Sequence, residues 1–454
     1  MKKGEVTAFL SLIIVLLVTF IGGIMESASV QMAKNYRRAD MNRAMESVFA
    51  EYQQELLEEY DIFSLEGTYE SGKYAEKMVE QRLAFFGAGS MENRIRRIQF
   101  LTDDGAEAFY EQVMYYMQHK YGKNCLKDKL PMTDTWKKQE EEAAGCEKEI
   151  HKKEAELEGL LKATGSVLPD EDNPIAYVSQ LKKRPLLELI MPGSRRVSDK
   201  KINLGESLSG RRRNKGYGDF SDAALDGGKL SMLLFGEYLM EHFSTAANEG
   251  EGGALDYELE YICAGRGSDR ENLKAVAERL MAMRFEANYR FLQSSASKRA
   301  EAAELAEALC TQAELIGLSG ASAQVILSSW AYGESLVDLR ALLNGSRVPL
   351  KKSEESWQLT ISDLMKLGES GKINDGRDCE KGLPYKEYLR MILFLEKRER
   401  AGMRALDMIE QNLRKAHGAK FFKADCCITK MEVKSTVRLR RGITYRFQTY
   451  YGYN

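Results

Sequence analysis

The sequence predicts an α+β protein that is mostly helical, in which a single N-terminal transmembrane helix continues into a long amphipathic helix and a small antiparallel sheet ends in a C-terminal β-hairpin. Three observations predict it. Residues 6–25 contain no charged side chain. Apolar residues recur at three- and four-residue steps through most of the chain, and over 443–451 they alternate at two-residue steps. Amphipathic helices and half-buried strands have these two periods.

The composition sets the class of protein. With 454 residues the chain is long enough for two or three folded units. Charged residues make up 30% of the chain, yet 66 Lys and Arg nearly cancel 68 Asp and Glu to leave −2. This balance excludes a polytopic membrane protein and a globally basic nucleic-acid binder. We expect four segments, 1–25, 26–122, 123–228 and 229–454.

The uncharged run 6–25 is predicted to be a membrane anchor. Its 20 residues match the hydrocarbon thickness of about 30 Å at about 1.5 Å per residue. Lys2 and Lys3 precede it and predict a cytoplasmic N-terminus, with the bulk of the chain outside the cell, although Lys34, Arg37 and Arg38 argue for the opposite orientation. A cleaved signal sequence, cut near 27–29, is the alternative. Gly22, Gly23 and Glu26 are the residues expected to pack against another membrane helix.

Segment 26–122 is predicted to hold one long helix from Met32 to Tyr60 and a second from Ala106 to Tyr121, after the turn signal Asp103-Asp104-Gly105.

Segment 123–228 is predicted to be a charged helical hairpin over 134–162 followed by a flexible linker. Trp136, Ala143, Ile150 and Leu157 fall seven residues apart, but half of the matching second seam, Gln139, Cys146, Lys153 and Leu160, is polar, which favours intramolecular packing over a dimeric coiled coil. Within the linker, 182–215 carries eleven basic residues against three acidic ones. Such a charge suits an anionic polymer or lipid, whereas the lack of interleaved aromatic residues argues against nucleic acid.

Segment 229–454 is predicted to be a compact α+β domain. Its expected helices cover 230–243, 268–292, 299–315, 321–343 and 385–413, and Ser268 and Glu271 form a capping box at the start of the second. Alternating apolar residues predict a strand over 255–263 and a terminal hairpin, 428–433 and 443–451, turning near 440–442. Cross-strand packing explains the tyrosines of this hairpin, and a partner surface is the alternative.

No pattern in the sequence indicates chemistry. The four histidines, His119, His151, His242 and His417, are at least 32 residues apart, and no complete phosphate loop, dinucleotide loop or zinc motif is present. We therefore expect no catalytic, cofactor-binding or metal-binding residues, and a protein that is not an enzyme. The seven cysteines are an odd number, and Cys263 and Cys310 are expected to fill apolar cores.

The opening KKGEVTAFLSLIIVLLVTFIGG, which continues as ESASVQMAKNYRRADMNRAMESVFAEY, resembles the N-termini of pilin-like proteins of tight-adherence pilus systems. Together with 259–292, 348–365 and 382–415, it is similar to a family of uncharacterised, membrane-anchored proteins of Gram-positive anaerobes associated with such pilus genes. The resemblance implies a pilin-like or accessory component of a pilus or secretion assembly, with protein partners from it. Phe9 stands where prepilins cut after Gly4 would carry a glutamate. A surface adhesin or sensor using 182–215, and an envelope hydrolase with a dispersed site, remain the alternatives.

Overall fold

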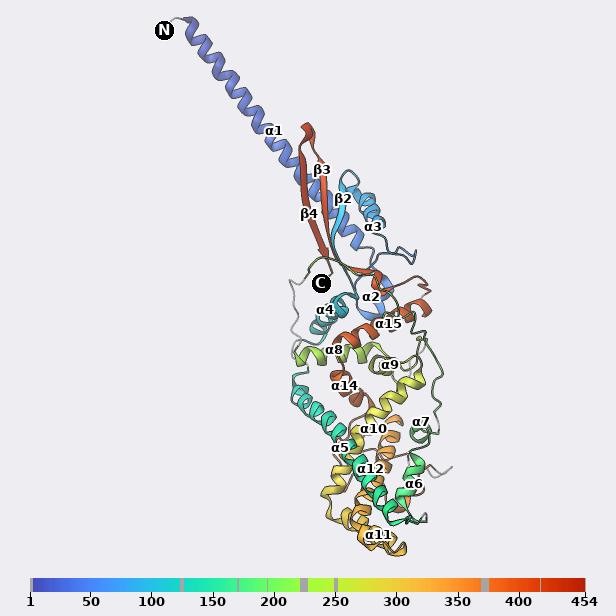
Figure 1. Cartoon of the computed structure of the whole chain (residues 1–454). Coiled ribbons are helices and arrows are strands. Elements are labelled where there is room, and N and C mark those ends of the chain that lie inside the picture. Colours follow the sequence, from blue (N-terminus) through green and yellow to red (C-terminus); the bar gives the residue numbers. More distant parts are fainter. Residues whose placement is uncertain are drawn as a thin grey trace. The chain divides into compact units, whose positions relative to one another are not determined.

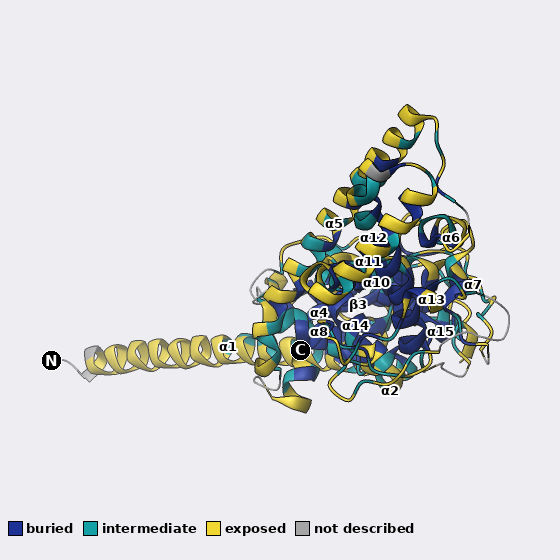
Figure 2. Cartoon of the chain, turned by 90° about the horizontal axis from the view of Figure 1, so that it is seen from below, coloured by how far each residue is buried: buried dark blue, intermediate teal, exposed yellow. Residues whose placement is uncertain are grey.

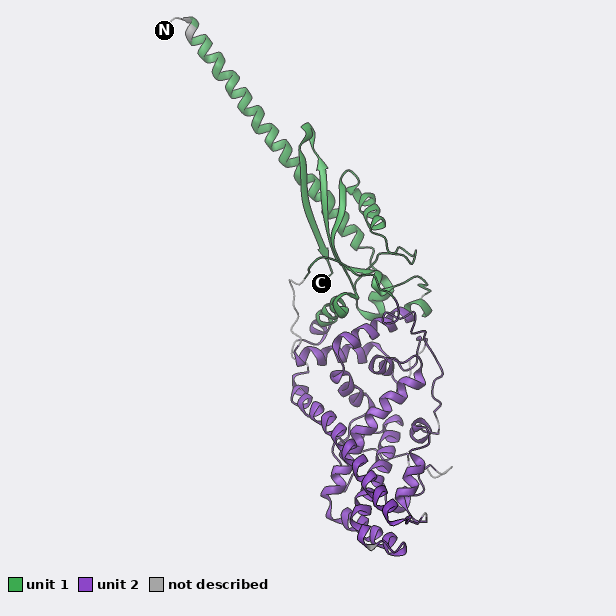
Figure 3. Cartoon of the chain, in the orientation of Figure 1, with its two compact units in different colours: residues 1–116, 212–225, 413–454 green, residues 117–211, 226–412 purple. Residues whose placement is uncertain are grey.

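The computed structural model describes residues 3–122, 126–169, 171–193, 195–220, 228–248, 252–368, 375–416 and 418–453. The chain divides into two compact units (Figure 3). Unit 1 holds residues 1–116, 212–225 and 413–454, so it combines both ends of the chain. Unit 2 holds residues 117–211 and 226–412.

Unit 1 consists of one very long helix and a four-stranded antiparallel sheet. Helix α1 (Lys3–Phe49) is followed by the short helices α2 (Gln54–Tyr60) and α3 (Glu76–Leu83), and α4 (Asp103–Tyr121) belongs to the unit up to Tyr116. The strands are β1 (Leu65–Glu66), β2 (Glu92–Phe100), β3 (Cys427–Arg438) and β4 (Thr444–Gly452). Strand β3 is central, since β2 pairs along one edge and β4 and β1 pair along the other.

The core of unit 1 lies between the C-terminal part of α1 and the sheet. Five side chains of α1 are buried against apolar residues of β2, β3 and α3: Met41, Ala44, Met45, Val48 and Phe49. Three tyrosines of the C-terminal strand, Tyr445, Tyr451 and Tyr453, pack on the same cluster, and the Tyr451 ring lies 4.7 Å from the Phe49 ring. The predicted hairpin is confirmed; Tyr445, Tyr451 and Tyr453 pack on the core cluster, whereas the fourth tyrosine of the tail, Tyr450, is 52% exposed.

In segment 26–122 one predicted helix ends too late and one strand is missed. The long helix ends at Phe49 rather than Tyr60. Three residues later the chain is extended, because Tyr52 forms a β-bridge with Leu65. Strand β2 was not predicted at all, because a bulge between Ile95 and Arg97 interrupts its two-residue alternation. The helix expected after the turn at 103–105 is present, and its regular part follows the left-handed residues Asp104, Gly105 and Ala106.

Unit 2 is a helical bundle. Its main helices are α5 (Leu130–Thr164), α6 (Pro174–Leu181), α7 (Leu186–Ile190), α8 (Lys229–His242), α9 (Glu258–Ala264), α10 (Asp269–Ser294), α11 (Ala296–Gln312), α12 (Ser319–Leu343), α13 (Ile361–Leu364), α14 (Tyr385–Leu395) and α15 (Arg398–Ala416, in this unit up to Asn412). The Ser268 hydroxyl caps α10 by accepting from the Glu271 N–H, as predicted.

Segment 123–228 is more ordered than predicted. The expected hairpin over 134–162 is a single helix, α5. The residues of its first seam, Trp136, Ala143, Ile150 and Leu157, are all buried within the chain, whereas Leu160 of the second is 43% exposed. The expected linker contains α6 and α7, and the Asn173 side chain caps α6 by accepting from the N–H groups of Ile175 and Ala176.

The strand predicted over 255–263 is wrong, since these residues include α9. Its apparent alternation came from two glutamates that are buried rather than exposed. The Glu258 carboxylate accepts from the Ser244 N–H at 2.9 Å, and the Glu260 carboxylate accepts from the Ala246 N–H at 2.9 Å. A helix whose polar residues are buried in the interior has no exposed face to reveal its period.

The single helix predicted over 385–413 is two helices, α14 and α15. The chain becomes extended at Glu396, whose carboxylate pairs with Arg400 at 2.7 Å in the first turn of α15. No Pro marks this break, so the apolar pattern runs through it.

Candidate functional site

The N-terminal half of α1 is an exposed apolar helix. It is the one helix among the described residues that is long and apolar enough to cross a membrane, and none of its most apolar 18-residue window is buried (Figure 2). A Cβ atom added at Gly22 or Gly23 would meet nothing within 4 Å. Such a helix serves as a membrane anchor or as a signal sequence.

An exposed seam continues from this apolar run toward the sheet. Residues 22, 25, 29, 32, 36 and 39 follow alternating three- and four-residue steps and are all exposed: Gly22, Met25, Ser29, Met32, Tyr36 and Ala39. Met25 is 68% exposed, Met32 57% and Tyr36 65%. The residues that face the sheet, such as Met41 and Val48, lie on another side of the helix. This spacing is that of a helix–helix packing surface, which we call the α1 seam.

Glu26, predicted to contact another membrane helix, is instead in an ion pair within the chain. Its carboxylate accepts from the guanidinium of Arg441, at the turn between β3 and β4. Gly22 and Gly23 have open space beside them, whereas Glu26 is paired with Arg441.

The basic segment 182–215 is largely engaged within the protein. Lys182 pairs with Glu154 at 2.8 Å, Lys200 pairs with Asp256 at 2.5 Å, and Arg211 binds the buried carboxylate of Glu410. Arg184 and Arg195 donate to backbone carbonyl groups of Gly368, Ala246 and Leu343. Lys183, Arg196, Lys201, Arg212 and Lys215 are exposed. Counting the basic residues in the sequence therefore overstates the positive charge that segment 182–215 presents to a polyanion.

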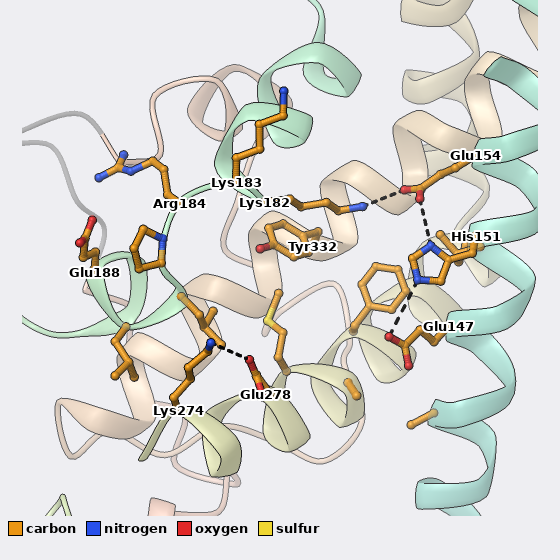
Figure 4. A pocket seen from close by; sticks show the side chains of 18 of the residues that line it. Glu147, His151, Glu154, Lys182, Lys183, Arg184, Glu188, Lys274, Glu278 and Tyr332 are labelled. Carbon is orange, nitrogen blue, oxygen red and sulfur yellow. Dashed lines mark hydrogen bonds and ion pairs between the residues drawn. The ribbon is translucent and has the colours of Figure 1, made fainter. Parts of the chain in front are cut away.

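A cavity of unit 2, about 920 Å³, lies between α5, α10, α12 and the turn from α6 to α7 (Figure 4). A chain of charges crosses its wall: the Lys182 ammonium contacts Glu154, which lies 3.5 Å from the His151 ring, and His151 in turn lies 4.0 Å from Glu147. The Lys182 ammonium is also 5.4 Å from the centre of the Tyr332 ring. Basic and acidic groups alternate here, so the cavity presents no concentrated positive charge.

A cluster of four charged side chains lies in the interior of unit 2. Arg284, Glu334, Asp338 and Lys352 have fully buried side chains, and the Lys352 ammonium lies 2.5 Å from Glu334 and 2.8 Å from Asp338. Arg284 lies 3.0 Å from Asp338. Burial raises the pKa of the Glu334 carboxyl. Burial alone would do the same to Asp338, but Arg284 and Lys352 outweigh it and hold the pKa of Asp338 below its ordinary value.

This cluster had no signal in the sequence, because its members come from α10, α12 and the loop after α12. Asn288 completes it by donating to Asp338 at 3.0 Å, and the Glu334 carboxylate also accepts from the Leu359 N–H at 2.8 Å. Each of the four charged side chains contacts a side chain of opposite charge. None of the four lines the cavity beside α5. The arrangement holds helices together rather than performing chemistry.

The histidines and cysteines do not gather into a site. Within the described residues, no group of three or more His, Cys, Asp or Glu side chains is placed to hold a metal ion. His151 lies at the α5 cavity, the centre of the His242 ring lies 4.3 Å from that of Tyr238 with the two rings tilted, and His417 lies outside the described residues. The six described cysteines are free; Cys263 and Cys310 are buried, as predicted, and Cys125 lies outside the described residues.

Comparison with known proteins assigns the chain to a family. Neither the curated proteins nor the solved structures include a match to this chain. One family model matches residues 165–439, which is more than half of the chain and covers most of unit 2 together with all of β3. The protein therefore belongs to the family of unknown function DUF5702.

Proposed function

We propose that this protein is a non-enzymatic, membrane-anchored component of a cell-envelope assembly of the tight-adherence pilus or secretion kind. In this proposal residues 6–25 span the membrane with the N-terminus in the cytoplasm, and the two units lie outside the cell. The resemblance of the N-terminal 52 residues to pilin-like proteins supports it. So does the uninterrupted course of α1 from the apolar run to the sheet.

The α1 seam is the observation that carries this proposal. A helix whose only task was to hold a domain at the membrane would not need apolar side chains beyond the bilayer. Met32 and Tyr36 lie seven and eleven residues after Met25, the last residue of the uncharged run, yet both are more than half exposed. A second helix that leaves the same membrane and packs along the seam would bury them.

The test compares two single substitutions at neighbouring exposed positions of α1. Met32→Glu places a carboxylate in the seam, and Gln31→Glu places one just beside it. We expect Met32→Glu to remain in the membrane fraction but to lose cross-links from α1 to envelope-assembly proteins in native membranes, while Gln31→Glu keeps them. Gly22→Leu with Gly23→Leu should weaken the same cross-links.

Unchanged cross-links in Met32→Glu would overturn the proposed packing role of α1. N-terminal sequencing of the mature protein provides a second, independent check. Retention of residues 6–25 supports an anchor, and a new N-terminus near 27–29 would make the segment a signal sequence and overturn the proposal.

The alternative, an adhesin or sensor that binds anionic polymer through 182–215, has weaker support. It relies on exposed basic residues such as Lys183 and Arg196, since Lys182, Lys200 and Arg211 already have acidic partners. Replacing Lys183, Arg196, Lys201, Arg212 and Lys215 together by Gln should abolish salt-sensitive polymer binding if this alternative holds.

A further inference from the structure

The tip of the β3–β4 hairpin exposes arginine side chains beside α1. The strands are joined by a tight turn over 440–442, in which Arg441 and Gly442 have positive φ values of 60° and 76°. Arg438, Arg440 and Arg441 are exposed, and Ile443 next to them is 38% exposed. The tip thus combines guanidinium groups with one accessible apolar side chain.

The part of this hairpin that follows Glu432 is basic. Residues 433–452 contain five basic side chains and no acidic one: Lys434, Arg438, Arg440, Arg441 and Arg446. Arg441 pairs with Glu26, but within the described part of the chain no carboxylate pairs with Arg438 or Arg440. Two guanidinium groups at the tip are therefore available to an external anion.

Three contacts fix how the hairpin lies along α1 (Figure 1). Near the C-terminus, the Tyr451 ring packs on Phe49. Further along, the Lys34 ammonium lies 5.4 Å from the centre of the Tyr445 ring. At the tip, Arg441 contacts Glu26. The hairpin therefore runs back along the helix, and its turn stops beside the first charged residue after the uncharged run.

That position sets the depth of the tip, given the membrane-spanning role of 6–25 proposed above, on which this step depends. The 20 uncharged residues cover about 30 Å, the thickness of the hydrocarbon layer. Glu26 then lies where hydrocarbon gives way to phosphate groups, and the turn over 440–442 lies at the same level. We propose that the hairpin tip binds the phosphate headgroups of anionic phospholipids in the membrane that holds α1, with Arg438 and Arg440 as the binding residues.

The chemistry of the tip fits this ligand. A guanidinium group donates two parallel hydrogen bonds to a phosphate, and an arginine near an anionic bilayer contributes about a fivefold gain in binding. Ile443 suits the boundary between headgroups and hydrocarbon. With the tip bound, α1 and the hairpin would meet the membrane at two points, which fixes the tilt of unit 1 at the bilayer.

The experiment uses the full chain in nanodiscs of phosphatidylcholine, with or without phosphatidylglycerol, and measures amide hydrogen exchange over 438–444. We expect phosphatidylglycerol to slow this exchange by about fivefold or more. The double variant Arg438→Gln with Arg440→Gln should lose this dependence on lipid. The control Lys434→Gln removes one positive charge from an exposed position of the same hairpin, four residues or about 13 Å beyond Arg438, which exceeds the Debye length of about 8 Å, and should keep it.

Three results would overturn the inference. The first is equal amide hydrogen exchange over 438–444 with and without phosphatidylglycerol, while the protein still floats with lipid vesicles of both compositions in a separate flotation assay. Flotation would show that the proposed anchor is intact. The second is protection of the tip by soluble polyphosphate but not by phosphatidylglycerol, which would identify a wall-type polyanion as the ligand. The third is failure of the protein to float with either vesicle, which removes the proposed anchor and the lipid site together.

Discussion

At the scale of single residues, Glu260 makes the stability of unit 2 depend on pH. Its carboxylate accepts from the Tyr385 hydroxyl at 2.8 Å, and burial raises its pKa to about 7. The folded state therefore holds a proton that the unfolded state releases near pH 4.5, the ordinary value. Because the folded state binds more protons in this window, its stability decreases as the pH rises from about 4.5 to about 7.

Glu260→Gln should remove the part of that decrease that comes from Glu260. We expect the free energy of unfolding of the variant, relative to the natural protein, to rise by on the order of 3 kcal/mol across this window and to stay level above it. Urea titration followed by tryptophan fluorescence measures it, because all three tryptophans, Trp136, Trp330 and Trp357, are in unit 2. The exposed Glu304→Gln should retain the natural pH profile, and a parallel profile for Glu260→Gln would refute the assignment.

The buried charge cluster makes a second prediction at this scale. Lys352→Met removes the ammonium that two fully buried carboxylates, Glu334 and Asp338, share. Breaking a buried ion pair on one side costs about 3–5 kcal/mol, because the remaining charge has no solvent. The adjacent Lys351 is exposed, so Lys351→Met should change stability by less than about 0.5 kcal/mol. Equal unfolding midpoints for the two variants would contradict the structural role.

At the scale of elements, α5 shows what periodicity can and cannot predict. The sequence predicted the seam of Trp136, Ala143, Ile150 and Leu157, and all four are buried. It did not show that the helix is continuous, because the predicted reversal rested only on the polar second seam. Gly145 and Gly159 lie within α5 without ending it. A seven-residue pattern reveals which face is buried, but not what buries it.

Leu157→Ala and Leu160→Ala form a matched test of that seam. Leu157 is 3% exposed and Leu160 is 43% exposed on the same helix. Truncating a buried leucine costs about 2–5 kcal/mol, because it removes apolar contact and leaves a cavity. We expect a loss of that size for Leu157→Ala and less than about 1 kcal/mol for Leu160→Ala, measured by tryptophan fluorescence. Similar losses would mean that both seams are packed.

The missed strand and the false strand both contain charged side chains that bind specific partners, and in the missed strand the bulge between Ile95 and Arg97 also interrupts the alternation. Arg96 and Arg97 of β2 are charged, but both bind the Glu432 carboxylate on β3, with N–O distances of 3.0 and 2.8 Å. Conversely, Glu258 and Glu260 resembled the exposed residues of a strand and are interior acceptors in α9. Hydropathy patterns assume that charge means exposure, so they fail where ion pairs and hydrogen bonds satisfy the charge.

At the scale of the whole molecule, the two ends of the chain were each predicted but their meeting was not. The apolar run and the terminal hairpin are local patterns, whereas the contacts of Glu26 with Arg441 and of Phe49 with Tyr451 join residues about four hundred positions apart. The helix predicted from Met32 to Tyr60 likewise contains both the exposed seam residues Met32 and Tyr36 and the buried residues Met45 and Val48. Only the position of the sheet separates the buried set from the exposed set, and the candidate site depends on that separation.

Unit 1 should therefore fail to fold without the C-terminus. Deleting 427–454 removes β3 and β4, which uncovers the apolar side chains of α1 over 41–49 and leaves β2 without its partner strand. We expect amide exchange over 41–49 and 92–100 to rise toward that of an unfolded chain.

The point variant Met431→Asp, which places a charge at a fully buried position of β3, should act in the same direction. Deleting residues 2–25, whose described side chains are all exposed, should leave the protection of 41–49 unchanged. Retained protection in the C-terminal deletion would show that α1 and β2 fold without the hairpin.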